Sequence, residues 1–161
     1  MPLPPVDHES FKRALGHFAS GVVVVTTRDR GGRDHGMTVS AFSSLSLDPP
    51  LVLACIGHDA TLAGPIAEAT HVGVSVLAER QEVLSQQFAR QDADRFDGAE
   101  ITRGESGVAL LDGALAHLEC RVVARHDAGD HAIVVGEVIA ARTFEGRPLL
   151  YWRGAYARIG R

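Results

Sequence analysis

Two long apolar runs separated by a four-residue turn constrain the fold of this chain more than any other feature. The runs are GALAHLECRVVARH (113–126) and HAIVVGEVIAARTF (131–144), and the turn between them is DAGD. Strands joined by so short a connection are antiparallel neighbours, because a parallel pair needs a crossover of about a dozen residues. The pair therefore predicts a long β-hairpin and disfavours a Rossmann-type sheet, in which strands alternate with helices.

Further strands are predicted from β-branched or apolar runs on either side of this hairpin. They cover residues 22–28, 35–47, 51–57 and 71–77, and the segment 148–159 is extended and aromatic. Helices are predicted at 7–18, 61–69 and 79–91 from the spacing of their apolar residues, with Asp7 and Thr61 as candidate N-caps. Residues 1–6 are proline-rich and form a loose arm, and the polar segment 91–107 is predicted to be a loop. This set predicts a mainly β protein, an antiparallel Greek-key-like barrel with a few flanking helices.

The composition limits the class of protein. A chain of 161 residues, 45% of them hydrophobic and 22% charged, is expected to be one globular domain spanning 1–161. Its formal charge of −4 disfavours binding to nucleic acid or to an anionic membrane. The first ten residues do not resemble a signal peptide, and no apolar run approaches the roughly 20 residues that span a bilayer. Cys55 and Cys120 lie inside apolar runs and are expected to be reduced, which predicts a cytoplasmic protein.

Several common catalytic and metal-binding motifs are missing from the sequence. There is no G-x-S-x-G elbow, no phosphate-binding G-x-x-x-x-G-K-[ST] loop and no G-x-G-x-x-G. The chain has eight histidines, yet no pair has the spacing of a zinc site. His126 and His131 flank one turn, but a third ligand would have to come from elsewhere. No metal site is therefore predicted.

Small hydroxyl side chains gather near the predicted strand 35–47. They are Thr38, Ser40, Ser43, Ser44 and Ser46. Such residues are common on the solvated face of an antiparallel strand, but hydroxyls and exposed backbone N–H groups can also hold a phosphate and a polar heteroaromatic ring. Thr61, at the start of a predicted helix, is open to the same two interpretations, as a helix cap or as a phosphate ligand.

Six segments in order make the chain similar to the flavin reductase-like family. They are ASGVVVVTT (19–27), GMTVSAFSSLSLDPPLVLACI (36–56), VSVLAERQEVLSQQFA (74–89), LDGALAHLEC (111–120), AGDHAIVVGEV (128–138) and PLLYWRGAY (148–156). The resemblance implies a flavin-binding split β-barrel, usually a homodimer with the flavin near the subunit interface. It implies hydride transfer from NADH or NADPH to FMN or FAD. It also implies that a separate flavin-dependent monooxygenase receives the reduced flavin.

The resemblance also assigns residues. Those of the flavin site would be Met37, Thr38, Val39 and Ser40 along the ring, Ser43 and Ser44 nearer the ribityl chain and phosphate, Cys55 and Ile56 through backbone groups, Thr61 and Arg90 at the phosphate, and Phe88 in the bordering helix. Those of the nicotinamide site would be His131, Tyr151, Arg153 and Tyr156. The chain departs from the family pattern at Ala41, at 58–60 and at Trp152. Asp59 would repel a nearby phosphate unless its side chain turns away.

The reaction that the resemblance implies needs no dedicated acid or base. Hydride transfer between stacked rings depends on proximity, so no residue is predicted to be catalytic in its own right. Two alternatives stay open, a flavin- or haem-binding carrier or sensor without NADH turnover and an enzyme whose bound flavin reduces another acceptor. The sequence leaves open FMN against FAD and NADH against NADPH, although no basic cluster near His131 favours the 2′-phosphate of NADPH.

Overall fold

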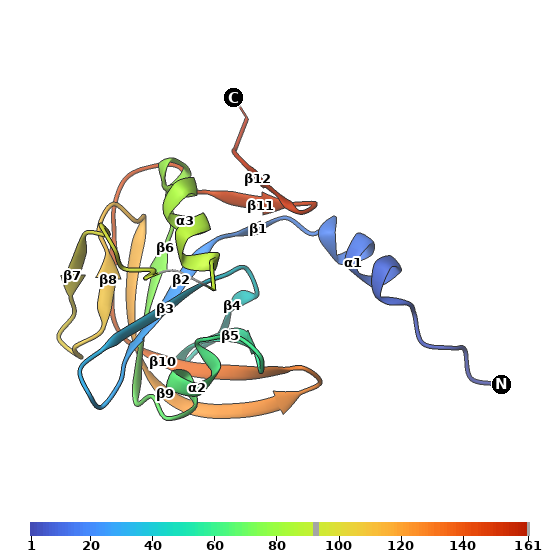
Figure 1. Cartoon of the computed structure of the whole chain (residues 1–161), viewed down its shortest axis with the longest axis horizontal. Coiled ribbons are helices and arrows are strands. Elements are labelled where there is room, and N and C mark those ends of the chain that lie inside the picture. Colours follow the sequence, from blue (N-terminus) through green and yellow to red (C-terminus); the bar gives the residue numbers. More distant parts are fainter. Residues whose placement is uncertain (92–93, 161) are drawn as a thin grey trace.

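The computed structural model describes residues 1–91 and 94–160 (Figure 1). The long hairpin lies at the centre of its main sheet. Strands β9 (Ala116–Ala128) and β10 (His131–Thr143) pair antiparallel from His131 opposite Ala128 to Thr143 opposite Ala116. Gly129, in the turn, has a φ of 61°, which glycine adopts at low cost. The register shifts at two places in β10, and such bulges increase the local twist and bend the strands. The hairpin predicted from the sequence is confirmed.

A seven-stranded antiparallel sheet forms around this hairpin, in the order β3-β2-β6-β9-β10-β5-β4. The other members are β2 (Val23–Arg28), β3 (Asp34–Val39), β4 (Phe42–Leu47), β5 (Pro50–Gly57) and β6 (His71–Val76). Its two edge strands, β3 and β4, are consecutive in the chain. The Cys55 N–H donates to the Ala41 carbonyl at 2.9 Å, which extends the β4–β5 pairing by one residue toward the end of β3. The sheet curls toward a barrel that stays split, and the predicted mainly β antiparallel fold is confirmed.

Two small sheets complete the strands of the described residues. β1 (Ser20–Gly21), β11 (Leu150–Trp152) and β12 (Ala155–Ala157) form one, and β7 (Ile101–Arg103) and β8 (Ala109–Leu111) form the other. The β7–β8 hairpin corrects the prediction that 91–107 is only a loop. The three residues of β8 are fully buried, and Thr26 donates its hydroxyl to the Ala109 carbonyl at 2.6 Å. Tertiary packing of β8 thus stabilises a hairpin whose partner strand is too short and polar to be recognised in the sequence.

Strand β2 separates two hydrophobic clusters, as its uninterrupted valine run predicts. Val23 and Val25 belong to the cluster inside the barrel, whereas Val22 and Val24 join the cluster beneath helix α3 (Glu82–Ala89). Phe88 of α3 is fully buried in the second cluster, 4.9 Å from the ring of Phe96 in an edge-to-face contact. A short 3-10 turn, η1 (Glu79–Gln81), precedes α3, so the helix predicted at 79–91 is confirmed in two pieces.

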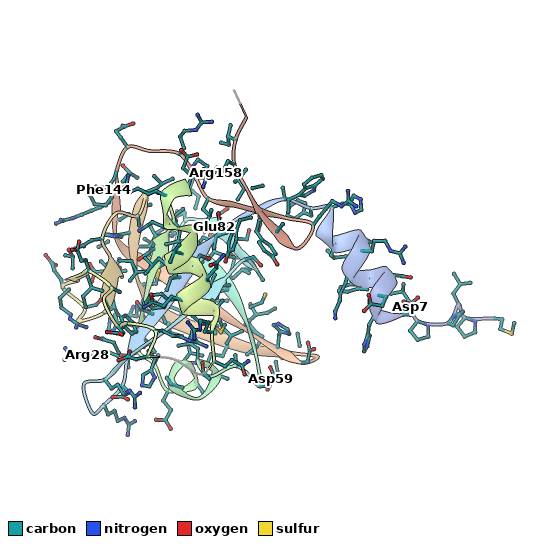
Figure 2. The ribbon with its side chains drawn as sticks, turned by 45° about the horizontal axis from the view of Figure 1, so that its top comes forward. Asp7, Arg28, Asp59, Glu82, Phe144 and Arg158 are labelled. Carbon is teal, nitrogen blue, oxygen red and sulfur yellow. The ribbon has the colours of Figure 1, made fainter. Side chains whose placement is uncertain are left out.

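Helix α1 (His8–Gly16) stands away from the barrel (Figure 1). Asp7 caps it as predicted and accepts a hydrogen bond from the Ser10 N–H at 2.9 Å. Figure 2 shows Asp7 at the outer end of this helix. The predicted apolar face does not pack within the chain, because Phe11, Leu15 and Phe18 are 55%, 53% and 79% exposed. Residues 1–6 precede the helix without regular structure and are exposed.

Helix α2 (Ala63–Ala67) is shorter than the predicted 61–69. Leu62 is its N-cap and offers no side-chain bond to the helix, so the prediction that Thr61 caps it is wrong. Both cysteines are free, with Cys120 fully buried and Cys55 half-buried. Across 1–91 and 94–160, no helix is both long and apolar enough to cross a membrane.

Candidate functional site

The two segments assigned to the flavin lie side by side. At one end, the Cys55 N–H bonds to the Ala41 carbonyl. At the other end, Gly36 and Thr61 line the same cavity. Residues 36–41 therefore run antiparallel to residues 55–61, although β4 and the first part of β5 separate them in the chain. A ligand that contacts both segments would lie along this shared length.

The hydroxyl groups of the first segment divide into accessible and committed ones. Ser40, Ser43 and Ser44 are exposed, and of these the Ser43 hydroxyl donates to the Ser44 carbonyl at 2.8 Å and can only accept from a ligand. Thr38 is half-buried and donates its hydroxyl to the Ser85 carbonyl of α3 at 2.6 Å. The serines can therefore meet a ligand through their side chains, whereas the Thr38 hydroxyl already stabilises the contact between β3 and α3.

The remaining residues of the first segment belong largely to the protein interior. Val39 is 4% exposed, and Met37 packs against the cluster inside the barrel. They can approach a ligand mainly through the backbone. Because β3 is an edge strand, the backbone groups on its outer side have no neighbouring strand in the sheet to pair with. That edge offers N–H donors to a ring lying against it.

The second segment offers fewer donors than the sequence suggests. The Cys55 N–H is engaged by Ala41, so the Cys55 backbone cannot donate to a ring edge while that bond exists. The side chain of Ile56 is 1% exposed. Thr61, in contrast, is exposed, and its hydroxyl makes no hydrogen bond to any described residue. Of the three residues predicted here, Thr61 has the side chain best placed for a ligand.

An open cavity of about 400 Å³ adjoins Thr61. Its walls come from the start of β3, from Thr61 and Leu62, and from Gln91 and residues 94–96. Arg95 is the most enclosed of its charged groups, at 9% exposure. Its Nε donates to the Arg90 carbonyl at 2.5 Å and its Nη1 to the Gly36 carbonyl at 2.7 Å. Burial lowers the pKa of Arg95 below its ordinary value.

The residues predicted at the end of α3 have different roles. Phe88 is a core residue, because its ring lies fully buried against the backbone of Gly36. A methyl group added to Gly36 would come within 2.9 Å of that ring, so the close approach requires glycine. Arg90 follows α3 as its C-cap and lines a neighbouring groove with Gln87 and Asp97. Phe88 thus supports the cavity wall without forming its surface.

His131 stands at the end of the barrel that also carries Thr61. It is the first residue of β10, directly opposite Gly57 of β5. Its Nδ1 lies 2.7 Å from a carboxylate oxygen of Asp130, which holds the pKa of Asp130 below its usual 3.8. The His58 N–H donates to the Asp130 carbonyl at 2.9 Å, which joins the hairpin turn to the end of β5. Figure 2 shows Asp59 at this end of the molecule.

The other predicted nicotinamide residues lie on the β11–β12 hairpin, which is on a different side of the molecule from the β9–β10 turn that carries His131 (Figure 1). Tyr156 shares a 2.8 Å hydrogen bond with the Ser85 hydroxyl, and its ring packs against Tyr151 at 5.6 Å. Arg153 lies in the turn with a φ of 51°, and its N–H donates to the Gly16 carbonyl. Among the residues that the structure describes, no hydrogen bond or ion pair links this hairpin to His131.

Two residues near the predicted site were missed by the sequence analysis. Ser85 joins Thr38 to Tyr156, and so ties the flavin segment to the C-terminal hairpin. Arg95 reaches Gly36 from a segment predicted to be loop. Neither belongs to a recognisable motif, and only the packing of α3 and the following residues on β3 reveals them.

Comparisons with known proteins give a consistent result. The flavin reductase like domain matches residues 15–160. The FMN reductase (NADH) SmoA of Agrobacterium fabrum is 45% identical over 152 residues, covering 94% of this chain and 86% of the relative. The reductase component of the 4-nitrophenol 4-monooxygenase/4-nitrocatechol 2-monooxygenase of Rhodococcus opacus is 39% identical over 157 residues, covering 98% and 84%. The NADH:FAD oxidoreductase SgcE6 of Streptomyces globisporus, in complex with NAD and FAD fragments, superposes with a TM-score of 0.92 at 37% identity, covering 99% and 97%.

Proposed function

The chain belongs to the flavin reductase-like domain family, and from this membership we propose that it transfers a hydride from NADH to FMN or FAD. The observation that carries the proposal is the family match over residues 15–160, nearly the whole described chain. NADH-dependent flavin reduction is the activity in the names of its relatives. We further propose that the chain is one domain and that a separate monooxygenase uses the reduced flavin, as the name of the Rhodococcus opacus relative indicates for that protein.

The residues present fit a flavin. Ser40, directly after β3, and Ser43 and Ser44 in β4 are exposed, and their hydroxyl groups suit a polar ring and a ribityl chain, which need donors and acceptors. Thr61 presents an unbonded hydroxyl to the adjoining cavity, where a phosphate would meet the guanidinium of Arg95. When bound, the flavin supplies the hydride-accepting chemistry, and the chain supplies the binding groups and the orientation.

His131 is the proposed contact for the nicotinamide. With Asp130 accepting from Nδ1–H, the neutral imidazole presents Nε2 as a hydrogen-bond acceptor, which suits the carboxamide N–H₂ of nicotinamide. Its task is to hold the dinucleotide within the near-attack range of about 3–3.5 Å. We keep Tyr151, Arg153 and Tyr156 as proposed contacts from a second side of the ligand, and the Tyr156–Ser85 bond places that hairpin beside the proposed flavin segment.

We also propose that the chain functions as a homodimer. A nine-residue helix with an exposed apolar face is marginal in water, so α1 needs a surface to cover Phe11, Leu15 and Phe18. The edge strand β4 exposes Leu45 and Leu47 by 50% and 92%, beside the exposed serines. A second copy that seats its α1 against β4 would cover both apolar surfaces at once and border the flavin site.

Light scattering of the purified protein tests this arrangement. We expect a dimer for the wild type and a monomer for the double variant Phe11→Asp/Leu15→Asp. Val83→Asp is the matched control, because Val83 is 75% exposed on α3 and belongs to neither of the two apolar surfaces. A monomeric wild type, or a dimer in the double variant, would contradict the proposal. The two free cysteines and the use of NADH support a cytoplasmic location, which is also a proposal.

The decisive experiment follows NADH oxidation by absorbance, with and without added FMN or FAD. Oxidation that requires flavin and saturates with it supports the reductase with flavin as a substrate. A protein that is purified yellow and is insensitive to added flavin holds it as a prosthetic group and reduces another acceptor. Binding of flavin or haem without any NADH oxidation would contradict the proposal and favour a carrier or sensor.

A further inference from the structure

Asp59 is a charged residue at the end of the barrel that carries His131, and the proposed function assigns it no task. It lies in a turn from Gly57 to Ala60, which the Ala60 N–H closes by donating to the Gly57 carbonyl at 3.0 Å. Gly57 is the last residue of β5 and pairs with His131 of β10. The strand register and the turn therefore bring the side chains of Asp59 and His131 toward one another.

The space over Gly57 is bordered by both side chains. A methyl group added to Gly57 would lie 3.1 Å from Oδ1 of Asp59 and 3.8 Å from Nε2 of His131. Both polar atoms therefore face one point that glycine leaves open. Gly57 is half-buried, so a ligand can reach this point from solvent. A ligand group that bonds to Nε2 of His131 would there meet the carboxylate of Asp59 as well.

The Asp59 carboxylate has no partner in the described part of the chain. Asp59 is exposed, and no described residue donates a hydrogen bond to its side chain or forms an ion pair with it. The carboxylate of Asp130, in contrast, lies 2.7 Å from Nδ1 of His131. That of Asp127 lies 3.7 Å from Nε2 of His58. Of these three carboxylates, Asp59 is the one whose charge stays available to a ligand.

Hydride transfer from NADH changes the charge of the nicotinamide ring. The C4–H bond of the dihydronicotinamide breaks, and the hydrogen leaves with both bonding electrons to form a bond to N5 of the flavin. NADH is thereby oxidised, the flavin is reduced, and the nicotinamide ring gains one positive charge. An opposite charge within about 4–6 Å favours the charged form of a group. A fixed charge beside the place where charge develops also lowers the barrier to the reaction.

We propose that Asp59 belongs to the nicotinamide site, where its carboxylate stabilises the positive charge that the ring gains as the hydride leaves. The inference rests on the proposed flavin-reducing function and deepens it by assigning a further residue to the reaction. Asp59 exchanges no proton in this step. Its carboxylate faces Gly57 and is not part of the described lining of the cavity beside Thr61, so it does not oppose a flavin phosphate there.

Equilibrium binding to the FMN-saturated protein tests the inference without turnover. The probes are NAD⁺, whose ring is positive, and the tetrahydro analogue of NADH, which is neutral and cannot donate a hydride. The absorbance spectrum of the bound flavin reports the binding of both. Asp59→Asn is expected to weaken NAD⁺ binding about three- to fivefold and binding of the neutral analogue by less than about twofold. A ratio of the two dissociation constants that equals the wild-type ratio would overturn the inference.

Asp127→Asn is the matched control, because it removes the same charge from the same end of the molecule while its carboxylate faces His58. It is expected to leave both dissociation constants within about twofold of wild type. If Asp127→Asn weakens NAD⁺ binding as much as Asp59→Asn does, the effect comes from the overall charge of this end, and the assignment to Asp59 is overturned. The midpoint of urea unfolding of Asp59→Asn is expected to equal that of wild type, since the carboxylate has no described partner.

Rapid mixing of the FMN-saturated protein with saturating NADH measures the rate of hydride transfer itself. Asp59→Asn is expected to slow flavin reduction about three- to fivefold at saturating NADH, because the lost charge acts on the transition state. A rate equal to that of wild type would overturn the inference. Failure of the proposed function is distinguishable, because wild type would then not oxidise NADH with either flavin.

Discussion

Nδ1 of His131 lies 2.7 Å from Oδ1 of Asp130, the preceding residue in the chain. An ionised carboxylate only accepts hydrogen bonds, so the ring proton of the neutral imidazole resides on Nδ1 and leaves Nε2 as an acceptor. Both side chains are accessible, at 48% and 96% exposure. The turn of the β9–β10 hairpin therefore fixes the tautomer of an exposed histidine at the end of β5, as a ligand-contacting histidine requires.

His131→Ala is expected to raise the KM for NADH by about two- to tenfold, the cost of one hydrogen bond, while kcat changes little. Steady-state kinetics at saturating flavin measure both constants. Asp130→Asn, which removes the carboxylate but keeps an amide oxygen as an acceptor, is expected to have a smaller effect in the same direction. Asp127→Asn makes the same change in charge beside His58, and it is expected to leave the KM unchanged. If His131→Ala has wild-type kinetics, His131 does not contact the nicotinamide and serves only as a residue of the turn.

Thr61→Val tests the hydroxyl that does not cap α2. We expect weaker binding of both FMN and FAD, by about three- to tenfold, because the variant loses one hydrogen bond to the first phosphate. The midpoint of urea unfolding is expected to stay within error of wild type, since the hydroxyl has no partner among the described residues. Riboflavin, which lacks a phosphate, is the matched control ligand and should bind both proteins equally. Equal affinities for FMN in the two proteins would remove Thr61 from the site.

The fold could be predicted where local rules and tertiary packing agree. The β9–β10 hairpin follows from two long apolar runs around a glycine-containing turn, and the Asp7 cap follows from a side chain that bonds to the next turn of its own helix. Where packing overrides local preference, prediction failed. The β7–β8 hairpin forms because the three residues of β8 are buried, and the polar sequence before it gave no sign of this.

The same distinction applies to the site. Ser40, Ser43, Ser44 and His131 could be selected from the sequence, because they lie in segments that resemble the flavin reductase-like family. Arg95 was missed, since nothing in a polar segment indicates that one of its arginines will be buried against Gly36, 59 residues away. The engagement of the Cys55 N–H by Ala41 was equally hidden, because it depends on the register of β4 against β5.

Gly73 in β6 has no room for a side chain, which gives a prediction about stability. A methyl group there would lie 2.6 Å from the Thr26 hydroxyl and 3.1 Å from the Ala109 carbonyl, two groups that bond to each other. Gly73→Ala is expected to lower the free energy of unfolding by about 1–3 kcal/mol through overpacking. Gly21→Ala is the control, because Gly21 is exposed in β1 and a methyl group there would have nothing within 4 Å beyond its chain neighbours. Urea unfolding of both variants measures the difference, and equal stability would mean that β6 can shift to make room.

Glu119 gives a prediction about acid stability. Burial by itself raises the pKa of this carboxyl, but hydrogen bonds from the Ser106 hydroxyl and N–H, at 2.6 and 2.8 Å, bring it below the ordinary 4.5. A carboxyl with a lowered pKa in the folded state stabilises the protein above its unfolded pKa, and this contribution is lost as the pH falls through the folded value.

Glu119→Gln removes that contribution. We expect the difference in unfolding free energy between wild type and Glu119→Gln to be constant above about pH 5.5 and to shrink progressively below about pH 4.5. Urea unfolding at intervals from pH 7 to pH 3 measures it. The lowered pKa values of Asp7, Asp29 and Asp130 affect both proteins alike, so they cancel from the difference. Ser106→Ala, which removes one donor but keeps the carboxylate, should narrow the pH range over which the difference changes. A difference that stays constant down to pH 3 would show that Ser106 does not favour the ionised form of Glu119.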